Sequence, residues 1–381
     1  MAAMTNRTQE SGFDPDRLQS ALDAVHRAGM PGICAEVRDG DRVWRGASGV
    51  ADLGTGRPVD PDIRHRVGSV TKTFTAAAVL RQVEEGRVRL DEPIGAYLPE
   101  LVPGERGRKI TVRMLLDHTS GISDYLPYAF PSLKGLPVLK DVSPASLDDN
   151  RFREFRAAEL IEMGLAAPPG GAPGGPVGTY SNTNYLLLGE VLEQVTGVTA
   201  EKCITRDVIE PAGLRNTSFP TGTPRIEEPH SLMYESLYGL IEPPRDYSVY
   251  DMSWVMTGAG LVSTVADLNH FFRELLDGRV VDRESLAQMQ RTGPVRALDG
   301  SKKLDYGLGL TRTEAPGGRV YWGHEGTVWG AGTTSQTSAD GRRQMTLALN
   351  LMRWNRPDAS GRLQPHAIDG ALAALHQLAL G

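Results

Sequence analysis

Cysteine, lysine and long apolar runs are all scarce in this sequence. Two cysteines, Cys34 and Cys203, are too few for a disulfide framework or a cysteine-ligated metal site, although one bridge between them stays open. The 41 basic and 47 acidic residues give a net charge of −6 without a basic block, which argues against nucleic acid as a partner. With 381 residues, 40% of them hydrophobic, the chain can bury a large core, which we expect to be divided between two subdomains.

Nothing in the sequence resembles a membrane segment. No run approaches the ~18 apolar residues that a membrane-spanning helix needs. The first residues, MAAMTNRTQESGFDPDRL, lack the apolar core of a secretory signal peptide. We therefore expect no membrane partner and a cytoplasmic location.

The two ends of the chain carry the strand signals. DPDRLQSALDAVHRAG, from Asp14, predicts an amphipathic helix, and GICAEVRDGDRVWRGASG, from Gly32, predicts two strands joined at Asp39-Gly40. Past residue 300, four segments predict strands and a fifth predicts a closing helix: LDYGLGLTR, RVYWGHEG, GTTSQTS, RRQMTLALNLM and PHAIDGALAALHQLAL.

Helical patterns dominate the middle of the chain. TVRMLLDHTSG, FRAAELIEMGLA and NYLLLGEVLEQVTG have helical spacing, and the loop GPVGTYSNTN ends where a helix begins. We therefore expect an α/β fold with an antiparallel sheet domain built from residues 1–87 and 256–381. Residues 88–255 would form a helical domain, with the active site in the cleft between the two.

The stretch HRVGSVTKTFTAAAVL, residues 65 to 80, places a serine and a lysine at the start of an apolar helix. A phosphate-binding loop is excluded because Thr71, not glycine, precedes Lys72. A helix cap at Ser69 with a solvated lysine is a second interpretation, but a cation is unfavourable at a helix N-terminus. A third is nucleophilic catalysis, because Ser69 and Lys72 share a helix face and the amine can take the hydroxyl proton.

Two further motifs accompany Ser69 and Lys72. TYSNTNY contains Tyr180 and Asn182 in a glycine-rich loop, a setting in which Tyr-x-Asn alone indicates only turn chemistry. WGHEGTVWG offers His324 on a predicted strand, where a lone histidine is more often structural. The three motifs together, in this order, favour catalysis.

The order Ser-x-x-Lys, Tyr-x-Asn and His-x-Gly resembles the class C β-lactamase family, with its relatives the serine DD-carboxypeptidases, D-amino-acid peptidases and carboxylesterases. The likeness covers nearly the whole chain and is greatest to the soluble actinobacterial DD-carboxypeptidases/transpeptidases. It implies a β-lactamase/DD-peptidase-like fold, in which an antiparallel sheet with terminal helices packs against an all-helical domain. The likeness rests on five segments: RVGSVTKTFTA, ITVRMLLDHTSGISDY, YSNTNYLLLGEVLEQVTG, AGLVSTVADLNHFF and YGLGL with YWGHEGTVWG.

Chemistry then suggests a role for each residue. Ser69 would attack a carbonyl and form an acyl-enzyme, and its proton would pass to Lys72 or Tyr180, two coupled bases between which the sequence does not choose. Asn182 would hold Lys72 and a substrate amide oxygen. His324 could hydrogen-bond the Tyr180 hydroxyl and help to protonate the leaving group. No metal or organic cofactor is required.

The resemblance implies further contacts. The backbone N–H groups of Ser69 and Thr327 would form the oxyanion hole. His118 of LLDHTSGISDY would be a structural hydrogen-bonding residue under the site. The resemblance also implies substrate contacts at four positions, Trp254, Thr311, Glu325 and Gly326. For Trp254, a place in the hydrophobic core is an equal alternative.

Two of these positions depart from the DD-carboxypeptidase pattern. Thr311 stands where those relatives have arginine, and Glu325 where they have threonine, while Arg312 would point to the opposite face of a strand. Two unit charges ~4 Å apart at an effective dielectric of ~20 repel by about 4 kcal/mol, so an anionic substrate terminus would be a poor fit.

We therefore expect a serine hydrolase or acyltransferase acting on a neutral amide or ester, in an intracellular tailoring or biosynthetic role. Its partners would be a small-molecule or peptide-like acyl donor and an amine or alcohol acceptor. A DD-carboxypeptidase or β-lactamase, and a non-catalytic acyl-binding sensor, are the alternatives.

Overall fold

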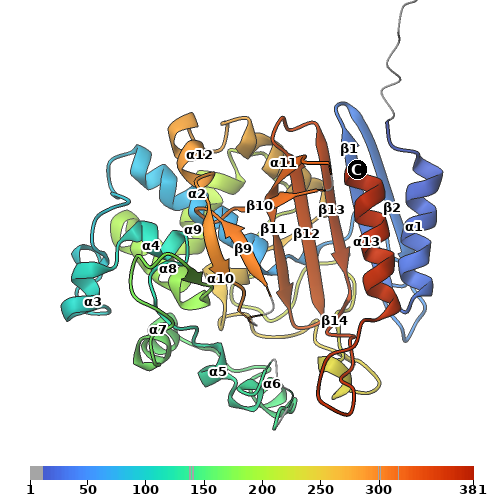
Figure 1. Cartoon of the computed structure of the whole chain (residues 1–381), viewed down its shortest axis with the longest axis horizontal. Helices are drawn as coiled ribbons and strands as arrows, with labels where there is room; N and C mark the ends of the chain where they lie inside the picture. Colours follow the sequence, from blue (N-terminus) through green and yellow to red (C-terminus); the bar gives the residue numbers. More distant parts are fainter. Residues whose placement is uncertain (1–11, 137–138, 140, 299, 301, 316) are drawn as a thin grey trace, which may run out of the picture.

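A nine-stranded sheet runs through the middle of the molecule, in the order β2-β1-β13-β12-β11-β10-β9-β8-β4 (Figure 1). The computed structural model describes residues 12–136, 139, 141–298, 300, 302–315 and 317–381. Its strands are β1 Gly32–Asp39, β2 Arg42–Gly49, β3 His65–Arg66, β4 Gly178–Thr179, β5 Tyr234–Glu235, β6 Arg245–Asp246, β7 Val262–Ser263, β8 Gly293–Arg296, β9 Lys303–Tyr306, β10 Thr311–Glu314, β11 Val320–Val328, β12 Ala331–Ser338, β13 Arg343–Leu349 and β14 Leu351–Met352.

Helices occupy both faces of this sheet and most of the middle of the chain. They are α1 Pro15–Arg27, α2 Thr71–Glu84, α3 Gly104–Lys109, α4 Val112–Leu116, α5 Leu126–Ala129, α6 Ala145–Asp149, α7 Ala157–Ala166, α8 Asn182–Thr196, α9 Ala200–Ile204, α10 Met256–Ala259, α11 Val265–Leu276, α12 Arg283–Met289 and α13 Ala367–Leu380. A 3₁₀ turn, η1 Gly68–Val70, precedes α2.

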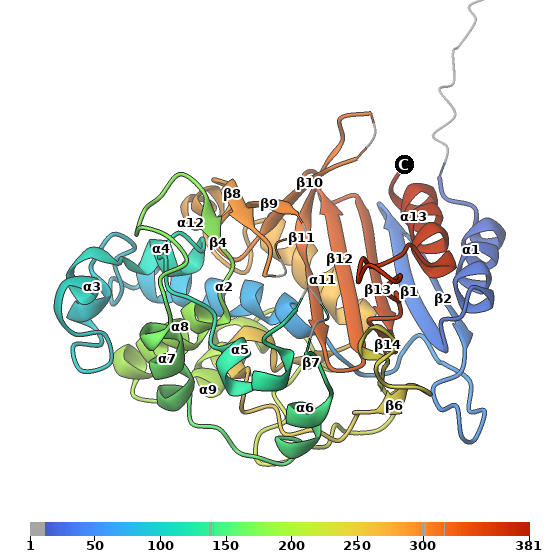
Figure 2. The same cartoon turned by 60° about the horizontal axis from the view of Figure 1, so that its bottom comes forward.

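The two ends of the chain meet on one face of the sheet. Helices α1 and α13 lie side by side against β1, β2 and β13, on the opposite side of the molecule from α3 and α7 (Figures 1 and 2). Alternate residues of β1, including Ile33 and Val37, pack with these helices, while Glu36 between them faces α11 and accepts from Asn269 Nδ2 at 3.1 Å. Strands from both termini therefore form one sheet, as the sequence predicted.

Local sequence signals explain the N-terminal elements. Asp14 caps α1 by accepting from the backbone N–H of Asp16 at 3.0 Å, and Pro15 is the first helical residue. Strands β1 and β2 pair in antiparallel register around a turn at Gly40, which has a φ of 60°. The predicted helix and hairpin are both confirmed.

Helix α2 is buried on all sides because it lies between the sheet and the helical part. Eleven of its fourteen residues are buried, and Phe74 stacks on Phe271 of α11 with ring centroids 3.7 Å apart. On the other side α2 packs against α8 and α10. This arrangement carries Ser69 and Lys72 to the junction between the two parts of the fold.

Two details differ from the sequence prediction. LDYGLGLTR is not one strand, because the chain turns between β9 and β10 at Gly309, which has a φ of 69° and whose carbonyl accepts from Thr73 at 2.7 Å. The sheet is also not wholly antiparallel, since β4 pairs with β8 in parallel. Because β4 comes from within residues 88–255, that segment contributes a strand to the sheet; the domain boundaries stay a prediction.

Both cysteines are buried free thiols, Cys34 in β1 and Cys203 in α9, so the bridge that the sequence left open is absent. Among the residues that the structure describes, no helix has the length and apolar character to cross a bilayer.

The turn at Gly309 gives a test of the packing on α2. A Cβ at this position would lie 2.4 Å from the Cβ of Ala76, so Gly309→Ala adds a clash to the strain of a left-handed backbone. Gly222→Ala is the matched control, because Gly222 has a φ of 73° and nothing within 4 Å of an added Cβ. We expect Gly309→Ala to lose about 1–3 kcal/mol more unfolding free energy than Gly222→Ala in urea denaturation. Equal losses would contradict this packing.

Candidate active site

Two glycines allow η1 to approach β11 closely. A Cβ on Gly68 would lie 2.5 Å from the backbone nitrogen of Thr327, and a Cβ on Gly326 would lie 2.7 Å from that of Ser69. Gly68 also has a φ of 56°, which favours glycine. The backbone nitrogens of Ser69 and Thr327 therefore lie in adjoining segments, as a two-donor oxyanion hole requires.

The Lys72 amine lies at the centre of the site. Its Nζ is 3.1 Å from Ser69 Oγ, 2.8 Å from Asn182 Oδ1 and 2.8 Å from the carbonyl oxygen of Gly258. The side chain is completely buried, whereas Ser69 is partly accessible. Burial disfavours the ammonium form and lowers the pKa of Lys72 to about 7, although Asp124 acts in the opposite sense.

Tyr180 is held on the other side of Ser69 by the edge of the sheet. Its backbone N–H donates to the carbonyl of Arg296 at 3.0 Å, just after β4 pairs with β8. The Lys72 Nζ lies 5.0 Å from the centre of the Tyr180 ring. Burial raises the pKa of Tyr180, and a hydrogen bond with Ser69 only partly opposes this effect. Tyr180 is therefore a neutral phenol at physiological pH.

His324 bonds to a different tyrosine from the one predicted. Its Nε2 is 2.9 Å from the hydroxyl of Tyr306, whereas the Tyr180 and His324 ring centroids are 6.5 Å apart. Its Nδ1 contacts the carbonyl oxygen of Glu325, which can only accept, so Nδ1 carries the proton and Nε2 accepts from Tyr306. Burial and the nearby Lys72 lower the pKa of His324 to about 3. The predicted bond from His324 to Tyr180 is absent.

His118 lies beneath the tyrosines. Its Nδ1 accepts from the backbone N–H of Ser181 at 3.2 Å and contacts Asn184 Nδ2 at 3.1 Å. The ring is completely buried and lies 4.2 Å from that of Tyr180, centre to centre. Burial lowers the pKa of His118 well below its usual value, so it is a neutral packing and hydrogen-bonding group.

Trp254 belongs to a buried aromatic cluster and is only 4% exposed. Its ring stacks on Trp329 with centroids 5.2 Å apart, and Phe130 meets it edge-on at 5.3 Å. Its indole N–H has no hydrogen-bond partner among the described residues. This packing favours the core alternative that the sequence left open for Trp254.

The rim of the site differs from what the sequence suggested. Thr311 Oγ1 donates to the carbonyl of Gly323 at 2.7 Å, so its hydroxyl is already used within the sheet. Glu325 is 57% exposed, and its carboxylate lies 3.1 Å from the ammonium of Lys302. The expected repulsion of about 4 kcal/mol treated Glu325 as an unpaired charge, and it is too large because a cation and solvent both screen this carboxylate.

The sequence did not predict a role for three residues of the site. The Gly258 carbonyl reaches Lys72 through the backbone, which sequence patterns do not reveal. Tyr306 stands in the YGLGL segment, and Asp124 in the LLDHTSGISDY segment, but neither had a predicted role. Asp124 accepts from the backbone N–H groups of Leu126 at 2.8 Å and of Asn182, the first residue of α8. A buried tyrosine and an acid within motifs already singled out were the available signals.

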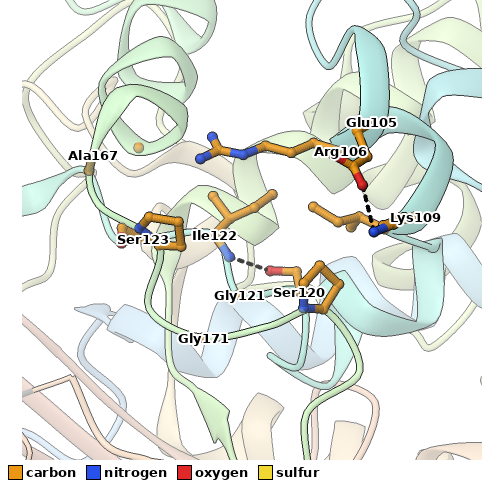
Figure 3. Close-up of a pocket in the computed structure, with 13 residues that line it drawn as sticks. Glu105, Arg106, Lys109, Ser120, Gly121, Ile122, Ser123, Ala167 and Gly171 are labelled. Atoms are coloured by element: carbon orange, nitrogen blue, oxygen red, sulfur yellow. Dashed lines mark hydrogen bonds and ion pairs between the residues drawn. The ribbon is translucent and has the colours of Figure 1, made fainter.

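A separate cavity of about 210 Å³ is lined by residues between Glu105 and Pro173, in the helical middle of the chain (Figure 3). It lies between α3, the end of α7 and the turn 120–123, where the Ile122 N–H donates to Ser120 Oγ at 3.1 Å. Neither Ser69 nor Lys72 lines it. In the part of the chain that the structure describes, no cluster of three His, Cys, Asp or Glu side chains could hold a metal ion.

Comparisons with known proteins identify the family of this chain. A family model described as Beta-lactamase matches residues 16–369. The D-aminopeptidase of Brucella anthropi is 26% identical over 360 residues, which cover 94% of this chain and 63% of that protein. Esterase EstB of Burkholderia gladioli is 32% identical over 221 residues, 56% of this chain and 54% of the esterase. The chain thus spans less than two thirds of the length of these relatives.

Solved structures give the same result for the fold. A D-stereospecific amidohydrolase from Streptomyces sp. has a TM-score of 0.78 and 33% identity, covering 95% of this chain and 99% of that one. The D-amino acid amidase from Ochrobactrum anthropi SV3, at 22% identity and a TM-score of 0.77 over 95% of this chain and 97% of its own, supports the fold alone. The β-lactamase/DD-peptidase-like fold predicted from the sequence is confirmed.

The contacts of His324 predict a single neutral tautomer. We expect ¹⁵N NMR to show a protonated Nδ1 and an unprotonated Nε2, with no titration between about pH 5 and about pH 8. Tyr306→Phe should raise the pKa of His324, because it removes the hydroxyl that donates to the neutral ring, and His324→Gln assigns the signal. Titration of His324 near pH 6.5 in the unmodified protein, the usual value, would contradict this arrangement.

Proposed function

The chain belongs to the β-lactamase family, as its sequence predicted, and we propose that it is a serine hydrolase that cleaves amides or esters through an acyl-enzyme. The family model covers residues 16–369. The names of the relatives, an aminopeptidase, an esterase and an amidohydrolase, all denote hydrolysis of an amide or an ester bond. They support this class of reaction.

One observation carries the proposal, namely the set of partners around Lys72 Nζ. Asn182 Oδ1 and the Gly258 carbonyl can only accept hydrogen bonds, and each is 2.8 Å from the amine. A neutral amine has two protons and one lone pair. If both protons go to these acceptors, the lone pair is directed at Ser69 Oγ, 3.1 Å away. This is the arrangement that a general base needs.

The chemical steps follow from this geometry. Lys72 takes the Ser69 proton while Oγ attacks the substrate carbonyl, and the oxyanion binds the backbone N–H groups of Ser69 and Thr327. The amine or alcohol leaves with a proton supplied through Lys72 or Tyr180, which gives the acyl-Ser69 ester. Water then attacks this ester, losing its proton to the same base, and the acid product leaves with Ser69 restored.

The pKa shifts distinguish the two candidate bases, Lys72 and Tyr180. Tyr180 stays protonated because its pKa is raised, so it acts as a proton relay, and Lys72 is the base. His324 accepts a hydrogen bond from Tyr306. Because its pKa is about 3, it is not protonated to imidazolium at neutral pH, so it does not serve as the proton donor suggested by the sequence. The site therefore depends on one titrating group near neutral pH.

For the acyl donor we propose an amide or ester of a D-configured residue. The relatives named as a D-aminopeptidase and a D-stereospecific amidohydrolase support this choice. A carboxylate-bearing donor, such as a D-Ala-D-Ala peptide or a penicillin, is a weaker candidate. The exposed Lys302–Glu325 pair moderates the repulsion of such a donor without providing a free cation to bind it.

Transfer of the acyl group to an amine or alcohol, in an intracellular tailoring role, stays a prediction from the sequence. Hydrolysis and transfer use the same acylation machinery and differ in the acceptor that reaches the acyl-enzyme.

Labelling of Ser69 tests the proposal directly. A fluorophosphonate should add one adduct by intact mass, and Ser69→Ala should add none, while Ser48→Ala, a half-buried serine in β2, should label normally. We also expect repeated turnover of D-amino-acid amides in preference to their L forms, and a new amide product when an added amine competes with water. Labelling elsewhere would refute the assigned nucleophile, and acylation without turnover would indicate the sensor alternative.

The Lys72 amine predicts the pH dependence. Because the base must be neutral, kcat/KM for a neutral ester should be lost as the pH falls below about 7 and level off above it. Lys72→Arg keeps the positive charge but cannot give up its proton, so it should lower the plateau of kcat/KM above about pH 7 by roughly 10²–10⁴-fold. A pH-independent rate from about pH 5 to about pH 9 would show that Lys72 is not the base.

A further inference from the structure

We propose that Asp124 is a positioning residue for catalysis: its carboxylate holds the first residue of α8 and supplies the negative charge that controls the protonation of Lys72. The catalytic meaning of this inference rests on the proposed function. The electrostatic effect of Asp124 on the Lys72 amine does not require a substrate.

The first support is the way in which Asp124 is held. One carboxylate oxygen accepts from the backbone N–H of Leu126 at 2.8 Å, and the other accepts from that of Asn182. The N-cap of α8, Ser181, makes no side-chain capping bond of its own. Asp124 therefore caps α8 from another segment, where the positive end of the helix dipole favours a carboxylate.

The second support is that the turn bearing Asp124 is fastened to the same end of α8. Ser120 Oγ donates to Asn184 Oδ1 at 2.7 Å, and Thr183 Oγ1 donates to the carbonyl of Ser123 at 2.7 Å. The Tyr125 N–H in turn donates to Thr183 Oγ1 at 3.2 Å. The turn that bears the carboxylate is thus tied to the start of α8 by three hydrogen bonds, although the cavity in Figure 3 adjoins this turn.

The third support is the link from Asp124 to the reacting atoms. Asp124 accepts from the backbone N–H of Asn182. The Asn182 Oδ1 then accepts from Lys72. Asp124 therefore holds the backbone of the residue whose side chain accepts from the reacting amine, which places the carboxylate one residue away from Lys72 along this chain of contacts.

Asp124 is the acid that acts on Lys72. Burial raises the pKa of Asp124, and the backbone N–H groups of Asn182 and Leu126 together with the Lys72 charge oppose this rise. The amine faces Ser69 Oγ, Asn182, the Gly258 carbonyl and the rings of two tyrosines, Tyr180 and Tyr185, all uncharged at neutral pH. The two nearby histidines, His118 and His324, are neutral. Among the described residues, Asp124 is the carboxylate whose charge favours the ammonium form of Lys72. Without it, the amine would lose its proton at a lower pH.

The scarcity of lysine allows a direct test. The chain has seven lysines, so ¹³C-labelled lysine side chains give a simple NMR titration, in which Lys72→Met identifies the Lys72 signal. We expect Asp124→Asn to lower the Lys72 titration midpoint by about one pH unit or more. Asp117→Asn is the matched control, because Asp117 in the same segment bonds to Thr119 and acts on neither Lys72 nor Asn182. Its Lys72 midpoint should stay in place.

Activity provides the second readout. The acid limb of the kcat/KM profile should move to lower pH in Asp124→Asn together with the NMR midpoint, while the plateau falls roughly 10-fold or more as Asn182 loses its support. Asp124→Glu keeps the charge and should keep the midpoint closer to that of the unmodified protein. If Asp124→Asn fails to fold, Asp124→Ser supplies a neutral cap in its place.

The outcomes separate this inference from the proposed function. An unmoved or raised Lys72 midpoint in the folded neutral variants would overturn the role of Asp124, even if Ser69 is labelled and turns over substrate. A lower kcat/KM plateau with an unmoved Lys72 midpoint would mean that Asp124 is only a structural cap, and this result would also overturn the inference. Conversely, a lowered midpoint without any labelling of Ser69 would support the field of Asp124 and refute the serine hydrolase.

Discussion

The chemistry proposed for this protein depends on the burial of one amine. In water Lys72 would be charged at neutral pH, but within the fold desolvation brings its pKa to about 7, so that its neutral form is accessible. Desolvation alone would leave an unsatisfied polar group, which the acceptors on Asn182 and Gly258 prevent. The same contacts aim the lone pair at Ser69. Stability and reactivity therefore have a common origin at this position.

The architecture supplies each of these conditions from a different direction. Helix α2 packs against α8 and α10, and its Phe74 stacks on Phe271 of α11, which removes water from Lys72. The close approach of Gly68 to β11 brings a second backbone N–H beside Ser69. The parallel pairing of β4 with β8 holds Tyr180 at the edge of the sheet. Because these elements are far apart in sequence, only the complete fold assembles the site.

Sequence patterns predicted those features that depend on side-chain identity and local spacing. The cap at Asp14, the hairpin at Gly40 and the grouping of Ser69 with Lys72 are of this kind. The patterns missed contacts made by the backbone, such as the Gly258 carbonyl on Lys72, because every residue has a carbonyl. They also predicted the wrong hydrogen-bond partner for His324, because only the tertiary structure distinguishes Tyr306 from Tyr180. The turn at Gly309 was hidden for the same reason, because contact with α2 interrupts an otherwise strand-like pattern.

The centre and the rim of the site differ in how strongly they constrain function. A change to a buried group such as Lys72 or Asp124 leaves a neighbour unsatisfied or uncompensated in a region of low dielectric, which is costly and limits the possible chemistry. Glu325 and Lys302 are each more than half exposed, so solvent screens their interaction and either can change at little cost. Under the proposed function, we therefore expect the reaction class to depend on the buried centre, and the preference for charged or neutral acyl donors to depend on the exposed rim.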